Sequence, residues 1–165
     1  MHGMTVFDIA IAELNGRADL LARHRGRTLL IVNVASQCAL AGQYAGLDTL
    51  ARRHHEDGLS VIGVPCNQFG EQEPGTPEEI AGFCSLQRIS FPLTEKTAVN
   101  GADRHPLYDA LTPCADAEGH SGDVRWNFEK FLVSPTGEPV GRFGPTVDPQ
   151  DPELLRAVRA QTQMQ

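Results

Sequence analysis

The chain has 165 residues, of which 41% are hydrophobic and 21% charged, values that suit an ordinary folded protein. A chain of this length can build one hydrophobic core and is short for two, so we expect a single domain over residues 1–165. The net charge of −7, with no basic run longer than Arg52-Arg53, argues against a protein that binds nucleic acid through its phosphates.

The sequence also argues against a membrane protein and a disulfide framework. No stretch approaches the roughly 18 consecutive apolar residues of a membrane span, and the first residues, MHGMTVFD, lack the basic start and apolar stretch of a signal peptide. Its four cysteines lie far apart, without a Cys-x-x-Cys pair or the spacing of zinc ligands. We therefore expect a cytoplasmic protein whose thiols are reactive or simply buried, and no metal.

The amino-terminal part of the chain predicts a β-hairpin. Residues 6–12 alternate in polarity, and Asn15-Gly16, a pair that favours tight hairpin turns, follows them. Two apolar runs rich in β-branched residues come next, at 29–34 (LLIVNV) and 59–64 (LSVIGV). Runs of this kind are typical of strands that a parallel sheet buries on both faces.

A helix between these two runs is indicated by apolar residues at helical spacing. Tyr44, Leu47, Leu50 and Ala51 share one face, charged residues follow them, and Gly58 stops the helix. Because a helix then connects two parallel strands, this part of the chain predicts a βαβ unit.

The rest of the chain continues the alternation of strands and helices. Thr76, Pro77 and Glu79 have the pattern of a helix start with a capping box, and the helix that follows carries Cys84 inward. Further elements are predicted in order: a strand at 91–93, a short helix at 105–111, a hairpin formed by 128–133 and 139–143, and a terminal helix around 154–158. The fold class is therefore α/β.

Cys38 is the residue that most strongly indicates chemistry. It follows the run at 29–34 and the stretch Ala35-Ser36-Gln37, directly before a predicted helix. The free N–H groups and positive dipole end of a helix start favour a thiolate, and α/β sheets place ligands at the carboxyl ends of their strands. A small buried core residue is the alternative interpretation of this position taken alone.

Hydrogen-bond donors gather in two further segments. The loop at 65–75, PCNQFGEQEPG, presents amides such as Gln72 at the same sheet edge as Cys38. Trp126 and Asn127 add an indole and a carboxamide N–H at the start of another apolar strand, and such donors can stabilise an anion. Taken singly, Gln72 is typical of a surface loop and Trp126 of a packed core, so the prediction depends on their combination.

Three of these segments, in this order, resemble the signature blocks of the glutathione peroxidase family. They are NVASQC at 33–38, PCNQFGEQEPG at 65–75 and WNFEKFL at 126–132. Smaller features, HPLY at 105–108 and FGPT at 143–146, extend the resemblance over nearly the whole chain. The resemblance implies a thioredoxin-like fold, with a central mixed β-sheet flanked by helices and an amino-terminal β-hairpin.

The resemblance also implies a mechanism. It places the peroxidatic cysteine at Cys38 and its catalytic partners at Gln72, Trp126 and Asn127. The implied enzyme is a thiol peroxidase that reduces hydrogen peroxide and organic or lipid hydroperoxides, because the Cys38 thiolate attacks the O–O bond and becomes a sulfenic acid. Cysteine stands where some relatives carry selenocysteine, and neither a metal nor an organic cofactor is implied.

Cys84 lies where relatives that form an internal disulfide carry their resolving cysteine. The resemblance therefore implies a Cys38–Cys84 disulfide, formed if the second helix unwinds and reduced by thioredoxin. The alternative is that Cys84 packs in the core. Cys66 resembles a non-catalytic family position and is expected to be buried, whereas Cys114 has no counterpart.

The sequence leaves two rival functions open. One is an enzyme that uses glutathione directly and leaves Cys84 idle, although no basic cluster near the motifs would hold an acidic tripeptide. The second is a peroxide sensor or redox relay that passes the oxidation of Cys38 to a partner protein. The segment between Leu111 and Trp126 is too short for the insertion that builds tetramers in long relatives, so we expect a monomer or a weak dimer.

The segment directly after Cys38 departs from the family pattern. Most relatives continue with glycine, an aromatic residue and Thr-Pro, whereas this chain has Ala39-Leu40-Ala41-Gly42. Alanine lacks the backbone freedom of glycine, and the missing proline no longer fixes the first turn. We therefore expect the helix to begin differently beside the active thiol.

Overall fold

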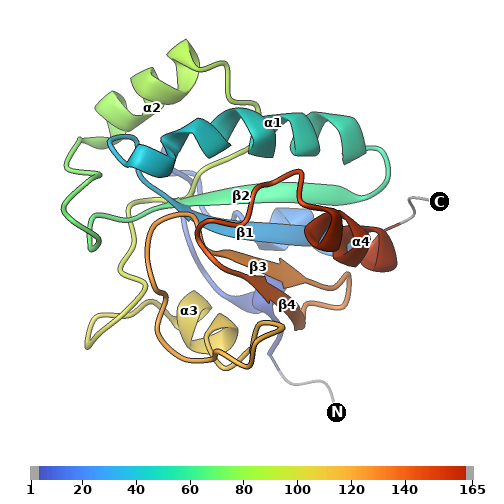
Figure 1. Ribbon diagram of the computed structural model, residues 1–165. Helices are drawn as coiled ribbons and strands as arrows, with labels where there is room; N and C mark the ends of the chain where they lie inside the picture. Colours follow the sequence, from blue (N-terminus) through green and yellow to red (C-terminus); the bar gives the residue numbers. More distant parts are fainter. Residues whose placement is uncertain (1–3, 163–165) are drawn as a thin grey trace.

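The computed structural model describes residues 4–162, so the first and last three residues of the expected domain lie outside it. Its centre is a sheet with the strand order β2-β1-β3-β4 (Figure 1). The strands are β1 (Thr28–Val34), β2 (Leu59–Pro65), β3 (Lys130–Val133) and β4 (Pro139–Phe143). Because β1 pairs parallel with β2 and antiparallel with β3, and β3 pairs antiparallel with β4, the sheet is mixed as predicted.

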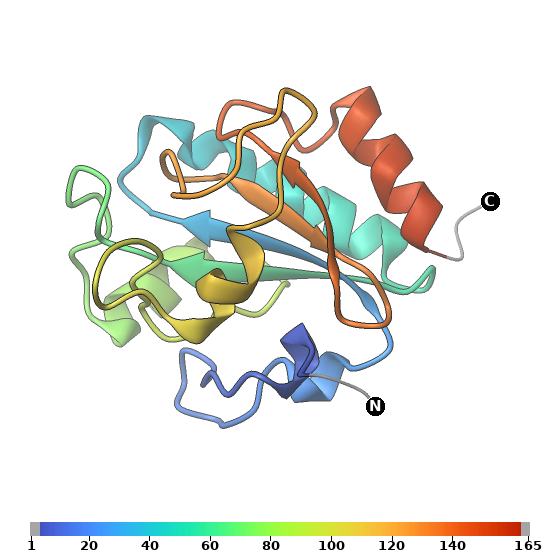
Figure 2. The ribbon, with the colours of Figure 1, turned by 90° about the horizontal axis from the view of Figure 1, so that it is seen from below.

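Helices cover both faces of this sheet. The α-helices are α1 (Gln43–His54), α2 (Pro77–Leu86), α3 (Pro106–Leu111) and α4 (Pro152–Gln161), and short 3-10 turns lie at η1 (Val6–Asp8), η2 (Ala22–His24) and η3 (Ala39–Gly42). Figure 1 shows α1 and α2 above the sheet and α3 below it. Seen from below, the amino-terminal segment lies on the same face as α3 (Figure 2).

Strand β1 is buried along its whole length and divides the core in two. Leu30, Val32 and Val34 pack in one cluster with residues of α1, α2 and α4, whereas Leu29 and Ile31 pack in a second cluster with α3 and the amino-terminal segment. Successive side chains of a strand point to opposite faces. A continuous apolar run is therefore what a strand with helices or loops on both faces requires.

The predicted βαβ unit is confirmed by β1, α1 and β2. In the parallel register Val34 lies beside Pro65, so both strands end at the same edge of the sheet. The loop that carries Cys38 leaves β1 at this edge, and the loop 65–75 leaves β2 beside it. The topology therefore brings together two of the three segments in which the sequence predicts chemistry.

The predicted amino-terminal hairpin does not form as a pair of strands. Val6–Asp8 form the 3-10 turn η1, and within the described residues no strand of the sheet precedes β1. Thr5 and Asp8 form a capping box around this turn, so local hydrogen bonds favour a turn over an extended strand. The chain does reverse at Asn15-Gly16, and Gly16 has a φ of +92° there.

Two other predicted strands differ from the structure. The segment 91–93 runs beside β2 but makes only an isolated bridge, between Leu93 and Gly63, because Pro92 has no N–H to donate to a ladder. The strand predicted from residue 128 begins at Lys130 as β3, since Phe128 has a φ of +69°, outside the extended region. The predicted helices at 105–111 and 154–158 are confirmed as α3 and α4. No helix within residues 4–162 could cross a membrane.

Candidate active site

Cys38 lies at the amino-terminal cap of η3, the 3-10 turn that leads directly into α1. Its Sγ atom accepts a hydrogen bond from the backbone N–H of Leu40 at 3.3 Å, and the residue is only 6% exposed. The prediction that the thiol lies at a helix start is confirmed. The atypical residues after it form the 3-10 turn Ala39–Gly42 itself, so a single tight turn separates the thiol from α1.

Gln72 and Asn127 contact each other through their side chains. The Asn127 Nδ2 atom donates to Gln72 Oε1 at 3.0 Å, and Asn127 is fully buried. This bond occupies the carbonyl oxygen of Gln72 and fixes which way its amide faces. The NH2 group of Gln72 is therefore presented as a hydrogen-bond donor.

Trp126 lies next to Gln72 and completes this group. A Cβ atom placed on Gly70 would lie 3.3 Å from Gln72 Nε2 and 3.3 Å from a ring carbon of Trp126. Gly70, with a φ of +65°, therefore permits the close approach of the amide and the indole. The Trp126 ring also packs against Phe69 with centroids 5.6 Å apart, and 37% of Trp126 is exposed.

Backbone hydrogen bonds connect the Cys38 loop to the loop that carries Gln72. The Gln37 N–H donates to the Gln72 carbonyl at 3.0 Å. The next residue, Glu73, accepts two bonds from Ser36, one from its N–H at 3.1 Å and one from its hydroxyl. Residues 36–37, directly before Cys38, and residues 72–73 are therefore fixed relative to each other.

Asn33 connects β1, the strand that leads to Cys38, to the segment that carries Trp126. Its role was not predicted from the sequence. Its Nδ2 atom donates to the Trp126 carbonyl at 3.0 Å, and its own carbonyl accepts from the Phe128 N–H at 2.7 Å. Asn33 is fully buried in β1. A polar residue inside the apolar run 29–34 was the available signal.

Glu73 is a second residue that the sequence analysis missed. The residue is fully buried, and its backbone N–H donates to Asn67 Oδ1 at 2.9 Å. Burial raises the pKa of the Glu73 carboxyl, although the hydrogen bonds from Ser36 favour the ionised form. A single acidic residue among the amides of PCNQFGEQEPG gave little indication of burial.

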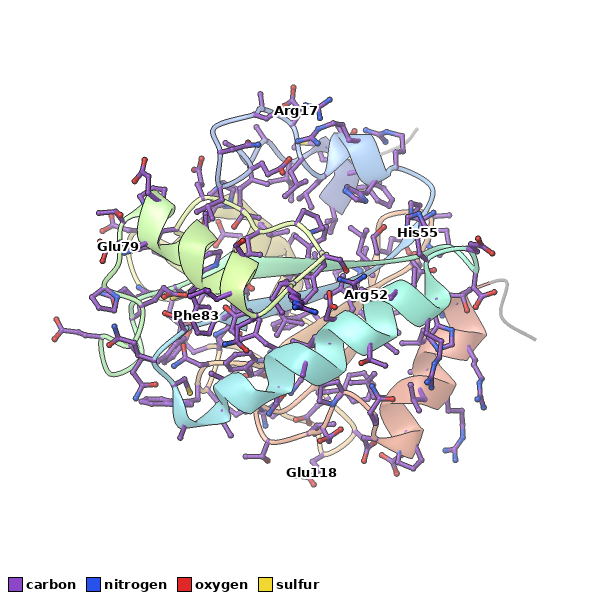
Figure 3. The ribbon with its side chains drawn as sticks, turned by 90° about the horizontal axis from the view of Figure 1, so that it is seen from above. Arg17, Arg52, His55, Glu79, Phe83 and Glu118 are labelled. Carbon is purple, nitrogen blue, oxygen red and sulfur yellow. The ribbon has the colours of Figure 1, made fainter. Side chains whose placement is uncertain are left out.

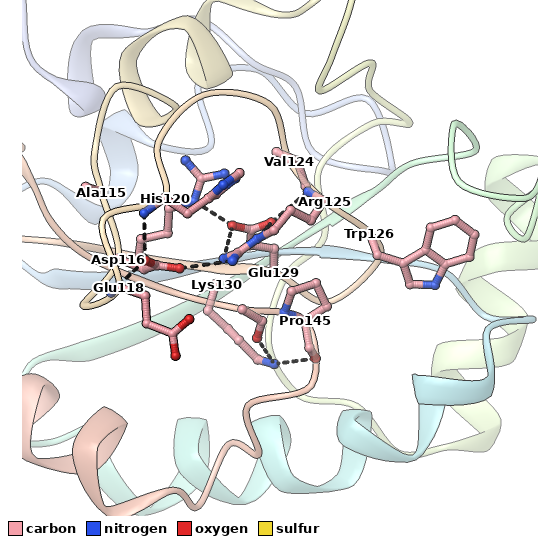
Figure 4. Close-up of polar contacts among 12 residues, drawn as sticks. Ala115, Asp116, Glu118, His120, Val124, Arg125, Trp126, Glu129, Lys130 and Pro145 are labelled. Carbon is pink, nitrogen blue, oxygen red and sulfur yellow. Dashed lines mark hydrogen bonds and ion pairs between the residues drawn. The ribbon is translucent and has the colours of Figure 1, made fainter.

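An ionic cluster around the buried Glu129 supports the segment that leads into Trp126 (Figure 4). Glu129 accepts bonds from Arg125 at 2.8 Å and from Arg142, and Arg125 also pairs with Asp116 at 3.0 Å. The partners and their hydrogen bonds lower the pKa of Glu129 against the effect of burial, so the carboxylate stays ionised. Figure 4 shows the Trp126 indole extending away from this cluster.

Lys130 holds a loop against the start of α1. The residue is fully buried, and its Nζ atom donates to three carbonyls of residues 144–147, that of Pro145 at 3.1 Å among them. The Pro145 carbonyl also accepts from the Gln43 side chain at 2.8 Å, and Gln43 begins α1 directly after η3. Lys130 therefore supports the helix start that follows Cys38.

Cys84 lies on α2 and is 8% exposed. Burial, and to a smaller extent the nearby Glu73 carboxylate, raise the pKa of the Cys84 thiol to about 11. The residue packs in the same cluster as Cys38, Tyr44 and Ile80. It also lines a groove of about 690 Å³ between α2, residues 13–15 and residues 89–93.

The other two cysteines lie away from these contacts. Cys66 is fully buried, burial raises its pKa, and its thiol donates to Gln68 Oε1 at 3.6 Å. Cys114 is partly exposed, and its carbonyl accepts a hydrogen bond from the Arg142 guanidinium at 3.1 Å. Within the described part of the chain, no group of three or more metal-binding side chains could hold an ion.

Solved structures identify the fold as thioredoxin-like. The structure resembles that of GPX1 from Trypanosoma cruzi, with a TM-score of 0.74 and 30% identity over 94% of this chain and 97% of the other. It also resembles a thioredoxin family protein from Chlorobium tepidum, with a TM-score of 0.65 and 14% identity over 98% and 99% of the two chains. The molecule is thus a thioredoxin-fold protein with a thiol at a helix start.

Sequence comparisons give the family. The glutathione peroxidase profile matches residues 6–112. The hydroperoxy fatty acid reductase Gpx2 of Synechocystis is 47% identical over 80% of this chain and 82% of its own length, and the thioredoxin/glutathione peroxidase BtuE of Escherichia coli is 38% identical over 94% and 96%. The chain belongs to the glutathione peroxidase family, and it is a thiol peroxidase.

Proposed function

We propose that this protein reduces hydrogen peroxide and organic or lipid hydroperoxides through Cys38, with Gln72, Trp126 and Asn127 as its catalytic partners. The observation that carries the proposal is the geometry of Gln72. Its backbone is bound to the residue before Cys38, and Asn127 fixes its side chain with the amide donor free. Trp126 lies against the same amide.

In the proposed reaction the Cys38 thiolate attacks one oxygen of the peroxide. An S–O bond forms, the O–O bond breaks, and the leaving oxygen takes a proton to become water or an alcohol. The Leu40 N–H stabilises the attacking sulfur. The Gln72 amide and the Trp126 indole N–H stabilise the charge that moves onto oxygen in the transition state.

Lipid hydroperoxides are expected substrates because apolar side chains lie at the surface beside the proposed site. The exposed Trp126 ring packs against Phe69, and the partly buried Leu40 lies next to Cys38. An acyl chain could lie on these side chains while its peroxide group reaches the thiol. The relatives named hydroperoxy fatty acid reductases agree with this substrate class.

The proposed cycle ends with a Cys38–Cys84 disulfide that thioredoxin reduces. Cys84 attacks the Cys38 sulfenic acid after α2 rearranges, because sulfurs must approach to about 2 Å to bond. The groove beside Cys84 contains Glu13 and Glu78, which disfavour glutathione with its two carboxylates. One relative is named for both thioredoxin and glutathione, so the reductant needs a direct test.

Single-turnover stopped flow followed by steady-state turnover tests this function. Hydrogen peroxide and a lipid hydroperoxide should each be consumed rapidly by the reduced protein and by Cys84→Ser, and not by Cys38→Ser. Thioredoxin should sustain turnover of the wild type and not of Cys84→Ser. Rapid consumption by Cys38→Ser would overturn the catalytic assignment, and fast oxidation without turnover by either reductant would favour a redox relay.

We further propose that the protein acts in the cytoplasm as a monomer or a weak dimer. Recycling by thioredoxin needs a reducing compartment, and widely spaced cysteines fit one. Sedimentation velocity at several concentrations and fractionation of cells test the two statements. A stable tetramer or a secreted protein would contradict them.

A further inference from the structure

Glu73 is a buried carboxyl group that contacts the loop of Cys38 and lines a cavity with α2, the helix that carries Cys84. It accepts two hydrogen bonds from Ser36, two residues before Cys38. Its charge contributes to the raised pKa of Cys84, and it lines one cavity with Ile80 and Phe83, which lie on the same helix as Cys84. None of the steps described so far uses this group.

A cavity of about 240 Å³ lies between the Cys38 loop and α2. Ser36 and Gln37 form its wall on the loop side, and Ile80 and Phe83 form its wall on the side of α2. Glu73 lines the same space. Ile80 lies one helical turn before Cys84 on the same face of α2, so the cavity gives this face room to move toward the loop.

Few other charges act on this pair. Lys96, whose ammonium donates to the Gly75 carbonyl at 2.7 Å, favours the ionised form of Glu73. Glu73 also acts electrostatically on the phenol of Tyr44 and the thiol of Cys66, and burial keeps both protonated by raising the pKa of each. Glu79 lines the cavity, but the Thr76 N–H binds its carboxylate in the capping box.

We propose that Glu73 is the general base of the resolving step, which takes the thiol proton of Cys84 as its sulfur attacks Cys38; this inference rests on the proposed two-cysteine cycle. The Cys84 S–H bond breaks and the proton passes to the Glu73 carboxylate. The S–S bond forms while the S–O bond of the sulfenic acid breaks, and the departing hydroxide takes the proton from Glu73 and leaves as water. One sulfur is oxidised and the other reduced, so no further reactant is needed.

Electrostatics favour this transfer over a thiolate that exists beforehand. The Glu73 carboxylate opposes a second negative charge on Cys84, and burial opposes both charges. Moving the proton from sulfur to the carboxylate keeps one negative charge in the pair throughout. Cys84 therefore stays an unreactive thiol until the electrophilic sulfur of the Cys38 sulfenic acid comes within bonding reach.

The test separates the two half-reactions in one experiment. Fluorescence of Trp126, the single tryptophan of the chain, follows the reaction of the reduced protein with peroxide. Acid quenching, alkylation and mass spectrometry measure the Cys38–Cys84 disulfide at each time. In Glu73→Gln, disulfide formation at pH 7 should slow on the order of 10²-fold, while Cys84 should react faster with iodoacetamide. Only a general base predicts these opposite changes.

Glu79→Gln is the matched control, because this residue lines the same cavity and glutamine preserves a capping box. It should change disulfide formation less than about 3-fold, a small effect beside that expected of a general base. The wild type supplies a test that needs no variant. Its rate of disulfide formation should rise as Glu73 ionises and then level off as the pH increases further.

Several results would overturn the inference. Disulfide formation that stays unchanged or speeds up in Glu73→Gln would do so, as would a wild-type rate that rises tenfold for each pH unit toward pH 10. If peroxide oxidises Cys38 normally but disulfide formation behaves in either of these ways, only the role of Glu73 is wrong. If Cys38 is not oxidised, the proposed function itself fails.

Discussion

The oxygen and the nitrogen of the Gln72 side-chain amide have different neighbours. Its oxygen accepts from Asn127, a fully buried residue that cannot easily move away. Its nitrogen lies close to the Trp126 ring. A fixed donor stabilises a developing anion better than water does, because it needs no reorientation during the reaction.

We expect Gln72→Ala to slow the oxidation of Cys38 by roughly 10²-fold, since removing one fixed donor from a transition state has this order of effect. The rate constant from Trp126 fluorescence at pH 7 measures it. Gln37→Ala is the matched control, because Gln37 contacts Gln72 through its backbone and its side chain is exposed. Equal slowing in both variants would contradict a specific role for the Gln72 amide.

Lys130 predicts a pH dependence of stability. Burial lowers the pKa of this ammonium from 10.5 to about 7. The unfolded chain therefore binds more protons than the folded protein between these two pH values, so the free energy of unfolding rises with pH in this window. Between about pH 7.5 and 9.5 the gain should be about 2 kcal/mol, and Lys130→Met should lack it.

Urea unfolding of both proteins at the two pH values measures this difference, because all other titrating groups are shared. An identical pH dependence would mean that the three carbonyls around Nζ keep the ammonium protonated.

The residues of the site differ in how far the sequence revealed them. Cys38 and Gln72 stand in segments whose polarity is unusual next to buried strands, so both could be found. Glu73 could not, because its burial depends on Ser36 in a loop 37 positions earlier. Asn33 was visible as a polar residue in an apolar run, but its partner carbonyl at residue 126 comes from another strand connection.

At the level of elements, α2 buries few of its side chains. Its residues line both the groove of about 690 Å³ and the cavity of about 240 Å³. Figure 3 shows Glu79 and Phe83, which line the cavity, on this helix. Only Ile80 and Cys84 of this helix are buried. A helix that buries so little is an element that can open locally while the sheet stays folded.

Thr76→Ala should make α2 open more often. The Thr76 Oγ1 atom accepts from the Glu79 N–H, and loss of such a cap costs about 1 kcal/mol. Amide hydrogen exchange within residues 78–86 should therefore speed up by about fivefold, with little change in β1. Ser85→Ala, an exposed substitution on the same helix, should leave this exchange unchanged. Equal protection in all three proteins would show that the cap does not control α2.

Elements with a single strong local signal were predictable, and those decided by competing signals were not. The runs at 29–34 and 59–64 have the length and β-branched composition typical of buried strands, and α2 has its cap, proline and capping box in sequence. Residues 6–12 alternate in polarity as a strand does, yet the capping box of Thr5 and Asp8 stabilises a 3-10 turn at this place instead. At 91–93 the apolar pattern predicts a strand, but Pro92 has no N–H to donate to a ladder, and only an isolated bridge forms.

For the whole molecule, charge bears on which reductant can approach. The chain carries a net charge of −7, and the groove beside Cys84 contains Glu13 and Glu78. Arg23 pairs with Glu13 at 2.8 Å, whereas Glu78 lies exposed in the first turn of α2. Small anions such as glutathione therefore meet an unfavourable potential at this groove.

Glu78→Lys should raise the rate at which glutathione reduces the oxidised protein. Reversing one charge near the approach path should give about a threefold increase at low ionic strength, and salt should reduce the gain because it screens exposed charges. Glu118→Lys makes the same change in net charge at a site that Figure 3 shows away from α2, so it should have little effect. If both variants gain equally, the total charge rather than the groove governs the reductant. If neither gains, reduction begins elsewhere on the protein.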